Sequence, residues 1–409
     1  MKIEKLTKDK QELVKDLYRL CFAAPFDSDS FNAYLDCDDL WDFVYGVVKE
    51  EQLLSSYIAY KGQVKIRTIP FDVHYFDGFV TRPGYRNRGM GRKLIENQKK
   101  VAKEEGVKLF ALDPFKNSYY KQFGFENALD LMKIEIPMRN LSTEKVEDLY
   151  PTKVISAFHS EEAINVLRDI YEREWVEGVY NPMRLPNAYF MGMFNNKSWK
   201  VCYFKNEFER YFGSILYEIK DRTLTVYKMS FFDLKGIFTF RDFFSQFKDQ
   251  IDTISFFKAP PDFPIDVFTD SFHAGSSRVN MRHYPTRMMQ ILDIENAINQ
   301  LLPVLELPKE TLEIKFIDSE IKENNKIISL SNLGVKTIKK RACDLTMAVS
   351  DFVPILTGMY NFSDQYKRGR VKMQTFPNPY WNNKLLPYQI KALDSVFPKT
   401  QTHNNEFCF

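Results

Sequence analysis

The sequence predicts an α+β protein built from more than one domain. Three observations support this. The chain has 409 residues, strand-like and helix-like segments alternate along it, and a Gly-rich turn joins one strand to one helix between Gly84 and Gly91. A chain of this length exceeds the size at which a single hydrophobic core usually stops growing. Strands and helices in mixed order are typical of an α+β architecture.

The first domain is expected to span residues 1–145. Apolar side chains at helical spacing predict a helix over residues 1–20, and aromatic and β-branched runs predict strands over 43–48, 53–60 and 73–80. A helix is predicted to begin at Met90, followed by strands over 108–112 and 131–136. The charged stretch 139–148 then indicates a boundary.

A second domain is expected over residues 146–287 and a third over 288–409. The second has a predicted helix over 160–174, strands over 199–204, 211–218 and 223–230, and a helix near 239–247. This order repeats that of the first domain, but no Gly-rich turn accompanies it. The third opens with the apolar run 288–294 and continues with strands near 312–317 and 326–330 and two late helices.

Composition excludes several classes of protein. Lys and Arg number 57 against 54 Asp and Glu, and a net charge of +3 creates no general attraction to nucleic acid or membrane. The amino terminus is charged throughout, and no uncharged apolar run approaches the roughly 18 residues of a membrane span. The five cysteines and five histidines are scattered, which favours neither zinc nor a disulfide framework. We expect a cytoplasmic protein without a metal or a nucleic-acid partner.

The Gly-rich turn carries the strongest functional signal. Five basic residues surround its three glycines: Arg82, Arg86, Arg88, Arg92 and Lys93. Glycine lets a ligand approach the backbone closely, and the start of the following helix offers free N–H groups and positive partial charge to an anion. The alternative is an ordinary glycine turn in a generic α/β protein.

Two motifs together resemble the GNAT superfamily of acetyltransferases. Arg86-Asn-Arg-Gly-Met-Gly91 fits the pyrophosphate loop R/Q-x-x-G-x-G/A, and Tyr120-Lys-Gln-Phe-Gly-Phe125 fits the Y-x-x-x-G-F ending of such domains. The resemblance implies acetyl-coenzyme A (acetyl-CoA) as the acetyl donor. It also implies that Tyr120 protonates the departing thiolate, while its neighbour Tyr119 packs. A phenol with a pKa near ~10 is protonated at neutral pH, as a general acid must be.

The whole chain resembles the Eis-type (enhanced intracellular survival) acetyltransferases. The matching segments are Val80–Gly89, Tyr120–Phe125, Met288–Ile294 and Asp344–Phe352, and the chain ends on Phe409 as family members end on Phe. The resemblance implies tandem GNAT domains, the second without a phosphate loop, followed by a sterol-carrier-like C-terminal domain. It also implies an amine acceptor and a homo-hexamer.

The resemblance assigns roles position by position. The backbone of Phe79, Val80 and Thr81 is expected to pair with the pantetheine arm. The residues expected to bind the pyrophosphate are Arg86, Asn87, Arg88, Gly89, Met90, Gly91 and Arg92. Phe115 and Lys116 are expected to contact the coenzyme further along. Asn87 and Phe125 depart from the residues common in the family, which bears on affinity more than on activity. The carboxy-terminal carboxylate of Phe409 is expected to serve as general base.

The acceptor is expected to bind the acidic, aromatic segment 25–43, for which Phe26, Asp27, Asp38 and Trp41 are candidate contacts. Carboxylates between aromatic rings suit a polycationic amine such as an aminoglycoside or a polyamine. A solvated acidic helix face is the alternative interpretation.

Two other functions remain open at this stage. One is a protein-lysine acetyltransferase, which an acidic cleft also suits. The other is a non-catalytic sensor that binds acyl-CoA or lipid through the third domain. Tyr120 beside a complete phosphate loop favours the enzyme, because a sensor needs no proton donor.

Overall fold

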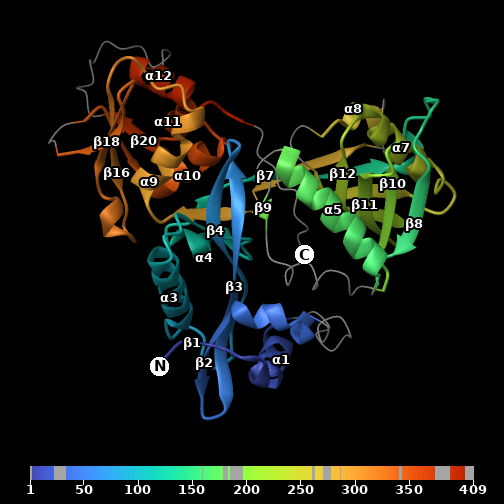
Figure 1. Cartoon of the computed structure of the whole chain (residues 1–409), viewed down its shortest axis with the longest axis horizontal. Coiled ribbons are helices and arrows are strands. Elements are labelled where there is room, and N and C mark those ends of the chain that lie inside the picture. The colour runs from blue at the N-terminus through green and yellow to red at the C-terminus, as the bar shows by residue number, and fades with distance from the viewer. Residues whose placement is uncertain are drawn as a thin grey trace. The chain divides into compact units, whose positions relative to one another are not determined.

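The computed structural model (Figure 1) describes residues 2–22, 34–158, 160–177, 183–184, 197–259, 263–269, 278–285, 287–339, 343–373 and 387–400. These residues form two compact units. The first combines residues within Met1–Ala23, Trp41–Leu129 and Pro285–Thr402, and the second combines residues within Ala24–Leu40 and Asp130–Tyr284. Mixed sheets with flanking helices in both units confirm the predicted α+β class.

The larger sheet of the first unit is built mainly from one long meander. Its strand order is β1 (Glu4–Lys5), β2 (Val44–Lys49), β3 (Gln52–Ile66), β4 (Ile69–Thr81), β5 (Leu109–Leu112), β15 (Met288–Ile291) and β6 (Glu126–Asn127). The β4–β5 pair is parallel, and its register runs from Val73↔Leu109 to Phe76↔Leu112. Beyond that last pair the two strands are no longer hydrogen-bonded to each other.

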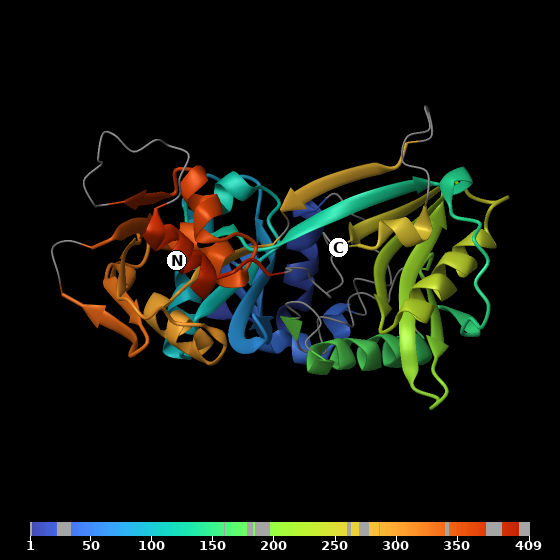
Figure 2. The ribbon, with the colours of Figure 1, turned by 90° about the horizontal axis from the view of Figure 1, so that it is seen from above.

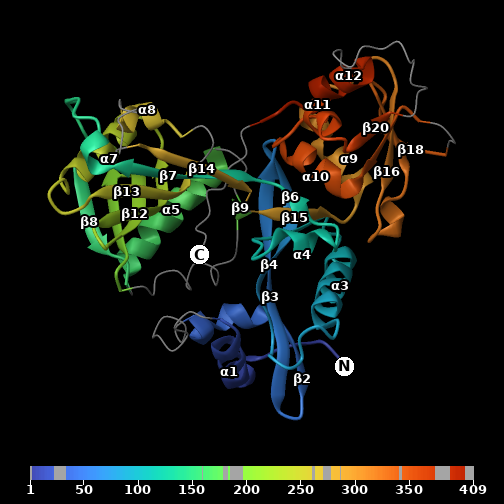
Figure 3. The same cartoon turned by 180° about the vertical axis from the view of Figure 1, so that it is seen from behind.

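Helices α1 (Gln11–Cys21) and α3 (Met90–Glu104) lie on opposite sides of strands β2–β4 (Figure 3). Leu94 and Ile95 of α3 pack on Phe76 and Phe110 of the sheet. The expected helix over residues 1–20 begins only at Gln11, because β1 pairs with β2. Shorter helices here are η1 (Lys8–Lys10) and α4 (Asn117–Lys121). η2 (Asp38–Asp42) spans the division between the two units, and η3 (Met138–Asn140) belongs to the second unit.

The β3–β4 hairpin is longer than the sequence predicted. Its two turn residues, Arg67 and Thr68, have left-handed φ angles of 51° and 73° without being glycine. Arg67 is 9% exposed and donates hydrogen bonds to the carbonyls of Leu356 (3.1 Å) and Ile355 (2.8 Å) at the end of helix α10 (Val349–Thr357). Burial lowers the pKa of Arg67 to about 10. The terminal carbonyls of α10 therefore have a cationic donor that the sequence pattern does not reveal.

The C-terminal part of the first unit has its own sheet. The strand order is β18 (Gly334–Ile338), β17 (Ile327–Ser331), β16 (Leu312–Ile317), β19 (Leu345–Ala348) and β20 (Val371–Met373). Its helices are α9 (Ile294–Leu301), η4 (Leu302–Val304), η5 (Lys322–Asn324), α10, α11 (Phe362–Lys367) and α12 (Tyr388–Val396). This α+β arrangement matches the predicted character of the C-terminal domain.

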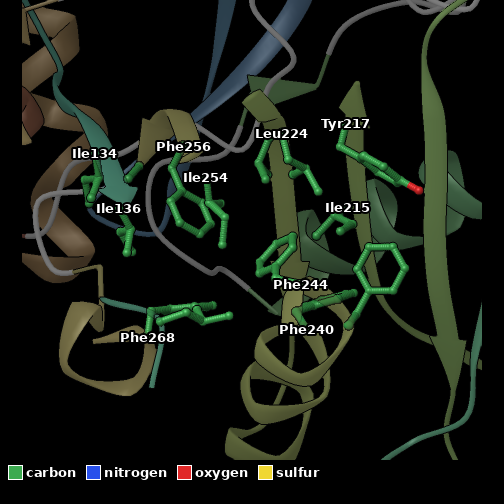
Figure 4. Packing of buried hydrophobic residues seen from close by; sticks show 14 of the residues in the cluster. Ile134, Ile136, Ile215, Tyr217, Leu224, Phe240, Phe244, Ile254, Phe256 and Phe268 are labelled. Carbon is green, nitrogen blue, oxygen red and sulfur yellow. The ribbon is translucent and has the colours of Figure 1, made fainter. Parts of the chain in front are cut away.

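The second unit contains a single mixed sheet. Its order is β14 (Asn280–Pro285), β7 (Asp130–Pro137), β13 (Thr253–Ala259), β12 (Thr223–Phe231), β11 (Tyr211–Lys220), β10 (Lys200–Lys205) and β8 (Thr152–Ser156), with β7 and β14 side by side in Figure 2. Its helices are α5 (Glu161–Glu177), α7 (Leu234–Ser245) and α8 (Ile265–Phe268), and β9 (Met183–Arg184) is a further short strand. Phe240, Phe244 and Phe268 fill its core together with Ile254 and Phe256 (Figure 4).

Two strands lie in a different sheet from the one that their place in the sequence suggested. β7 was expected as the last strand of the first domain, but it pairs with β13 in the second unit. β15 was expected to open the third domain, but it lies between β5 and β6. Figure 3 shows β15 next to β6. Both strands are apolar and lie next to a predicted boundary, and sheet membership depends on the partner strand rather than on the strand's own sequence.

Candidate functional site

The turn between β4 and α3 has the backbone of an anion-binding site. Gly89 is the residue that precedes α3, its φ is 73°, and a side chain added there would meet nothing within 4 Å. Asn87 is also left-handed, with φ 60°. The first N–H groups of a helix have no partner inside the helix. The turn therefore presents these groups, and the positive end of the α3 dipole, to open space.

Gly91 has a different reason to be glycine. A Cβ atom on it would collide with the Tyr119 hydroxyl and lie 2.9 Å from Cζ of Phe79. The first turn of α3 can thus approach these two rings only because the residue lacks a side chain. Gly89 leaves space for a ligand, whereas Gly91 allows the protein to pack on itself.

The basic residues of the turn do different things. Arg86 and Arg88 are exposed beside Gly89; Arg86 Nε donates to the carbonyl of Thr81 at 3.0 Å, and Arg88 lies over the Tyr85 ring at 5.5 Å. Arg82 holds the turn to the protein through Asp16 of α1 and the Leu53 carbonyl. Two exposed guanidinium groups therefore stand where an anion would meet the helix start.

Arg92 points toward the C-terminal part of the unit. Its guanidinium lies 4.7 Å from the centre of the Phe123 ring, and Nη1 lies 3.5 Å from Oε2 of Glu320. Among the residues expected to bind the pyrophosphate, Arg92 is the one whose guanidinium lies within ion-pair distance of a carboxylate in the described part of the chain, that of Glu320.

Phe79, Val80 and Thr81 stand beyond the last β4–β5 pair. Ser55 on β3 donates to the Val80 carbonyl at 2.6 Å, and its hydroxyl lies 2.8 Å from that of Thr81. One edge of this segment is thus paired with β3. The opposite edge lies beyond Phe76, the last residue of β4 that pairs with β5. An extended chain could pair along that edge.

Tyr120 lies in α4, enclosed by aromatic rings. It is 3% exposed, and its ring contacts those of Phe115 (5.5 Å between centres), Tyr119 (5.1 Å) and Phe125 (6.1 Å). Burial, and then the charges of Tyr119 and Asp77, raise the pKa of Tyr120 above its usual range. The phenol therefore stays protonated at neutral pH, which a proton donor requires.

The turn after Tyr120 is held by hydrogen bonds from two different elements. The Phe123 carbonyl accepts hydrogen bonds from Lys99 Nζ of α3 and from Gln290 Nε2 of β15, both at 2.8 Å. Gly124 follows with φ 87°, and a Cβ there would lie 2.7 Å from Gln290 Nε2. A strand far along the chain thus fixes the Tyr-x-x-x-Gly-Phe motif, a dependence that the motif itself does not show.

Sequence reasoning also missed three charged residues, Asp77, Asp113 and Arg287, of which Asp77 acts electrostatically on Tyr120. Arg287 is 1% exposed and donates to Asp113 from Nε (3.0 Å) and Nη2 (3.3 Å). Asp77, an accessible residue on β4, lies within the electrostatic reach of both. Asp77 and Asp113 each directly follow a buried residue of a strand, Phe76 and Leu112, which pair with each other. A carboxylate after the buried run of each strand is the signal that could have identified them.

The remaining predicted site residues lie outside the described ranges or in η2 and next to α4. Phe26, Asp27 and Phe409 lie outside the described residues. Asp38 is exposed and Trp41 is 6% exposed, both in η2. Phe115 is 72% exposed beside Tyr119, and Lys116 is the residue that precedes α4, without a side-chain hydrogen bond to the helix start.

Within the described ranges, no group of three or more His, Cys, Asp or Glu residues is placed to hold a metal ion. No helix of the described chain is both long and apolar enough to span a membrane.

Known proteins resemble the chain in two ways. Residues 2–128 match the family model described as an acetyltransferase (GNAT) domain. Eis1 from Mycobacterium abscessus superimposes over 100% of both chains, with a TM-score of 0.75 and 16% identity. A GCN5-related N-acetyltransferase from Anabaena variabilis also covers 100% of both chains, with a TM-score of 0.78 and 13% identity.

A conserved protein of unknown function from Enterococcus faecalis has a TM-score of 0.79 at 15% identity, over 100% of this chain and 99% of its own. At such identities these three structures establish a shared fold along the whole chain. No curated protein matches the chain.

Proposed function

We propose that this chain, whose residues 2–128 form a GNAT acetyltransferase domain, transfers acetyl from acetyl-CoA to an amine of a polycationic small molecule, an aminoglycoside or a polyamine. The domain match confirms the family predicted from the two motifs, and the full-length fold match agrees with an Eis-type architecture. The observation that carries the proposal is the coexistence, in one unit, of an open helix start with exposed arginines and a buried, protonated Tyr120.

The residues present fit acetyl-CoA. Open space at Gly89, the first N–H groups of α3, Arg86 and Arg88 would hold the pyrophosphate. The backbone of Phe79–Thr81 would pair with the pantetheine arm along the edge that β5 has left. Acetyl-CoA supplies the acetyl group as an activated thioester.

Proton transfers fall to two residues. As the amine nitrogen forms its bond to the acetyl carbon and the carbon–sulfur bond breaks, Tyr120 gives its proton to the sulfur. The nitrogen must lose a proton, and the carboxylate of Phe409, expected as the base from the Eis-type resemblance, would take it. Desolvation among aromatic side chains would raise the pKa of that carboxylate toward a useful value.

The test combines binding with turnover in the full-length chain. Calorimetry should find one acetyl-CoA bound per chain, at the first unit. Release of the coenzyme thiol should then be measured with an aminoglycoside, spermidine and a lysine-containing peptide as acceptors. Turnover of the first two above the peptide supports the proposal, and the reverse order would favour a protein-lysine acetyltransferase. Tight acetyl-CoA binding without turnover of any acceptor would favour a sensor and contradict the enzyme.

A further inference from the structure

Three charged residues lie side by side where strands β4 and β5 separate. Phe76 pairs with Leu112, and Met288 of β15 pairs with the same Leu112. Asp77 and Asp113 are the next residues after Phe76 and Leu112, and Arg287 directly precedes Met288. The register of three adjacent strands therefore brings Asp77, Asp113 and Arg287 together at one end of the sheet.

These carboxylates lie on the face of the sheet opposite α3. Phe76 and Leu112 belong to the core that α3 covers, and successive side chains of a strand alternate between faces. The charge of Asp77 acts on the Tyr18 phenol of α1, and this hydroxyl donates to the Gly78 carbonyl at 2.9 Å, so Asp77 lies on the α1 side of β4. Asp77 thus shares its face with α1 and its aromatic side chains.

Asp77 and Asp113 differ in the donors that bind their carboxylate oxygens. Both oxygens of Asp113 accept hydrogen bonds from the buried Arg287, whose guanidinium also lies 4.9 Å from the centre of the Tyr75 ring. Asp77 accepts from the backbone N–H of Gly78 at 2.7 Å, and its side chain remains accessible. Although accessible, Asp77 is crowded by protein atoms, and this desolvation and the charge of Asp113 raise its pKa.

The backbone holds Asp77 next to the reacting centre. Gly78 has φ 57°, and a Cβ there would collide with the Tyr18 hydroxyl, so the strand is irregular at this point. Phe79, the first residue proposed to pair with the pantetheine arm, follows directly. The charge of Asp77 also acts on the Tyr120 phenol. The carboxylate therefore lies close to both parts of the machinery.

We propose that the Asp77 carboxylate binds a second, non-reacting ammonium group of the acceptor and so selects diamines and larger polycations over monoamines. A carboxylate paired with the reacting nitrogen would stabilise its protonated, unreactive form, so the productive partner is another ammonium of the same molecule. The assignment rests on the proposed N-acetyltransferase activity.

The experiment compares matched amines. Values of kcat/KM for putrescine and cadaverine are set against those for butylamine and pentylamine in the full-length wild type, Asp77→Asn, Asp77→Glu and Asp72→Asn. Asparagine preserves an acceptor for Gly78 N–H. Asp72 is an exposed aspartate on the same strand, bonded to Gln63 at 2.9 Å, and is the control for a general loss of charge.

We expect Asp77→Asn to lower kcat/KM for the diamines by about 10- to 100-fold, the range for a hydrogen bond to a charged group, with little change for the monoamines. Asp77→Glu should retain the preference for diamines, and Asp72→Asn should match the wild type. Acetyl-CoA affinity, measured by calorimetry, should be equal in all four proteins.

An unchanged ratio of diamine to monoamine kcat/KM in Asp77→Asn would overturn the assignment, as would a wild type without any preference for diamines. A wild type that binds acetyl-CoA but acetylates no amine would remove the proposed function and this assignment together. A variant with weakened acetyl-CoA binding would place Asp77 in support of the coenzyme and contradict the role in acceptor recognition.

Discussion

Helices α3 and α7 begin at equivalent places in the two units, but a side chain caps the first turn of α7 and none caps that of α3. Each follows a long strand and precedes a parallel one, β4 and β5 in the first unit and β12 and β13 in the second. At the start of α3, Gly89 provides no side-chain cap. At the start of α7, Asp233 accepts a hydrogen bond from Gly236 N–H at 2.7 Å and another from the Tyr150 hydroxyl at 2.8 Å.

The difference concerns the source of negative charge. A helix start favours an anion, and α7 receives one from its own chain. Asp233 is in turn fixed by Tyr150, whose pKa is raised to about 12 by burial and by this bond. At α3 the equivalent charge is left for a ligand to supply. The same element order thus gives an uncapped helix start, which we propose as the coenzyme site, in one unit and a capped helix in the other.

The strongest test of this contrast replaces Gly89. Gly89→Val should weaken acetyl-CoA binding by about 100-fold or more, because a β-branched residue is strained at φ 73° and would occupy the space left for phosphate. The measurement is calorimetry on folded protein. Gly106→Val is the matched control, since Gly106 also has φ 73° and open surroundings but lies at the far end of α3. Equal loss in both variants would show that strain alone is responsible.

Replacing the proposed proton donor, Tyr120, should change the rate of acetyl transfer without changing coenzyme binding. Tyr120→Phe should lower kcat by about 100- to 10,000-fold, the range for general acid catalysis, and leave the Kd of acetyl-CoA unchanged. Because the pKa of Tyr120 is raised, kcat of the wild type should not fall through loss of this proton below about pH 10. Normal turnover by Tyr120→Phe would assign the role to another group.

Extending the chain beyond Phe409 tests the proposed base. A few added residues would displace the terminal carboxylate, so kcat should fall by about 100-fold, near the lower end for general base catalysis. Coenzyme affinity should be unaffected, because the open helix start belongs to α3. Cleaving the extension back to Phe409 should restore the rate, and full turnover by the extended protein would refute the assignment.

The smallest effect is expected on the capped helix. Asp233→Ala should lower the free energy of unfolding by about 1 kcal/mol, as is usual for loss of an N-cap, without changing kcat or acetyl-CoA affinity. Chemical denaturation measures the change. Asp293→Ala removes a comparable cap, the acceptor of Asn296 N–H in α9, and should cost about the same. A change in coenzyme stoichiometry in Asp233→Ala alone would show that the carboxylate had been excluding a second coenzyme.

Those parts of the site that are local in sequence could be predicted from it. The Gly-rich turn and the Tyr-x-x-x-Gly-Phe ending need only nearby residues. The place of the first between a strand and a helix, and of the second after the next strand, was therefore identified correctly. Gly89 and Gly91 look alike in the motif, but a side chain at Gly89 would meet open space, whereas one at Gly91 would collide with Tyr119 and Phe79.

Features that depend on pairing between distant strands could not be predicted. Asp113 and Arg287 lie far apart in the chain and meet because β5 and β15 are neighbours. The tip of the β3–β4 hairpin, Arg67–Thr68, lacks the glycine or asparagine that usually marks such a turn. Likewise, Arg92 belongs to the phosphate motif by sequence, yet its partner Glu320 is supplied by a distant segment.

The position of β15 has a consequence for synthesis of the protein. In the described sheet, β15 (Met288–Ile291) lies between β5 and β6, so this sheet has a gap until that segment has left the ribosome. By then residues 130–284 of the second unit have been translated, and the edges of β5 and β6 that face β15 stay unpaired for all of that time. The first domain to be translated is therefore the one that must wait longest to be completed, and Gln290, which holds the turn after Tyr120, arrives with its last strand.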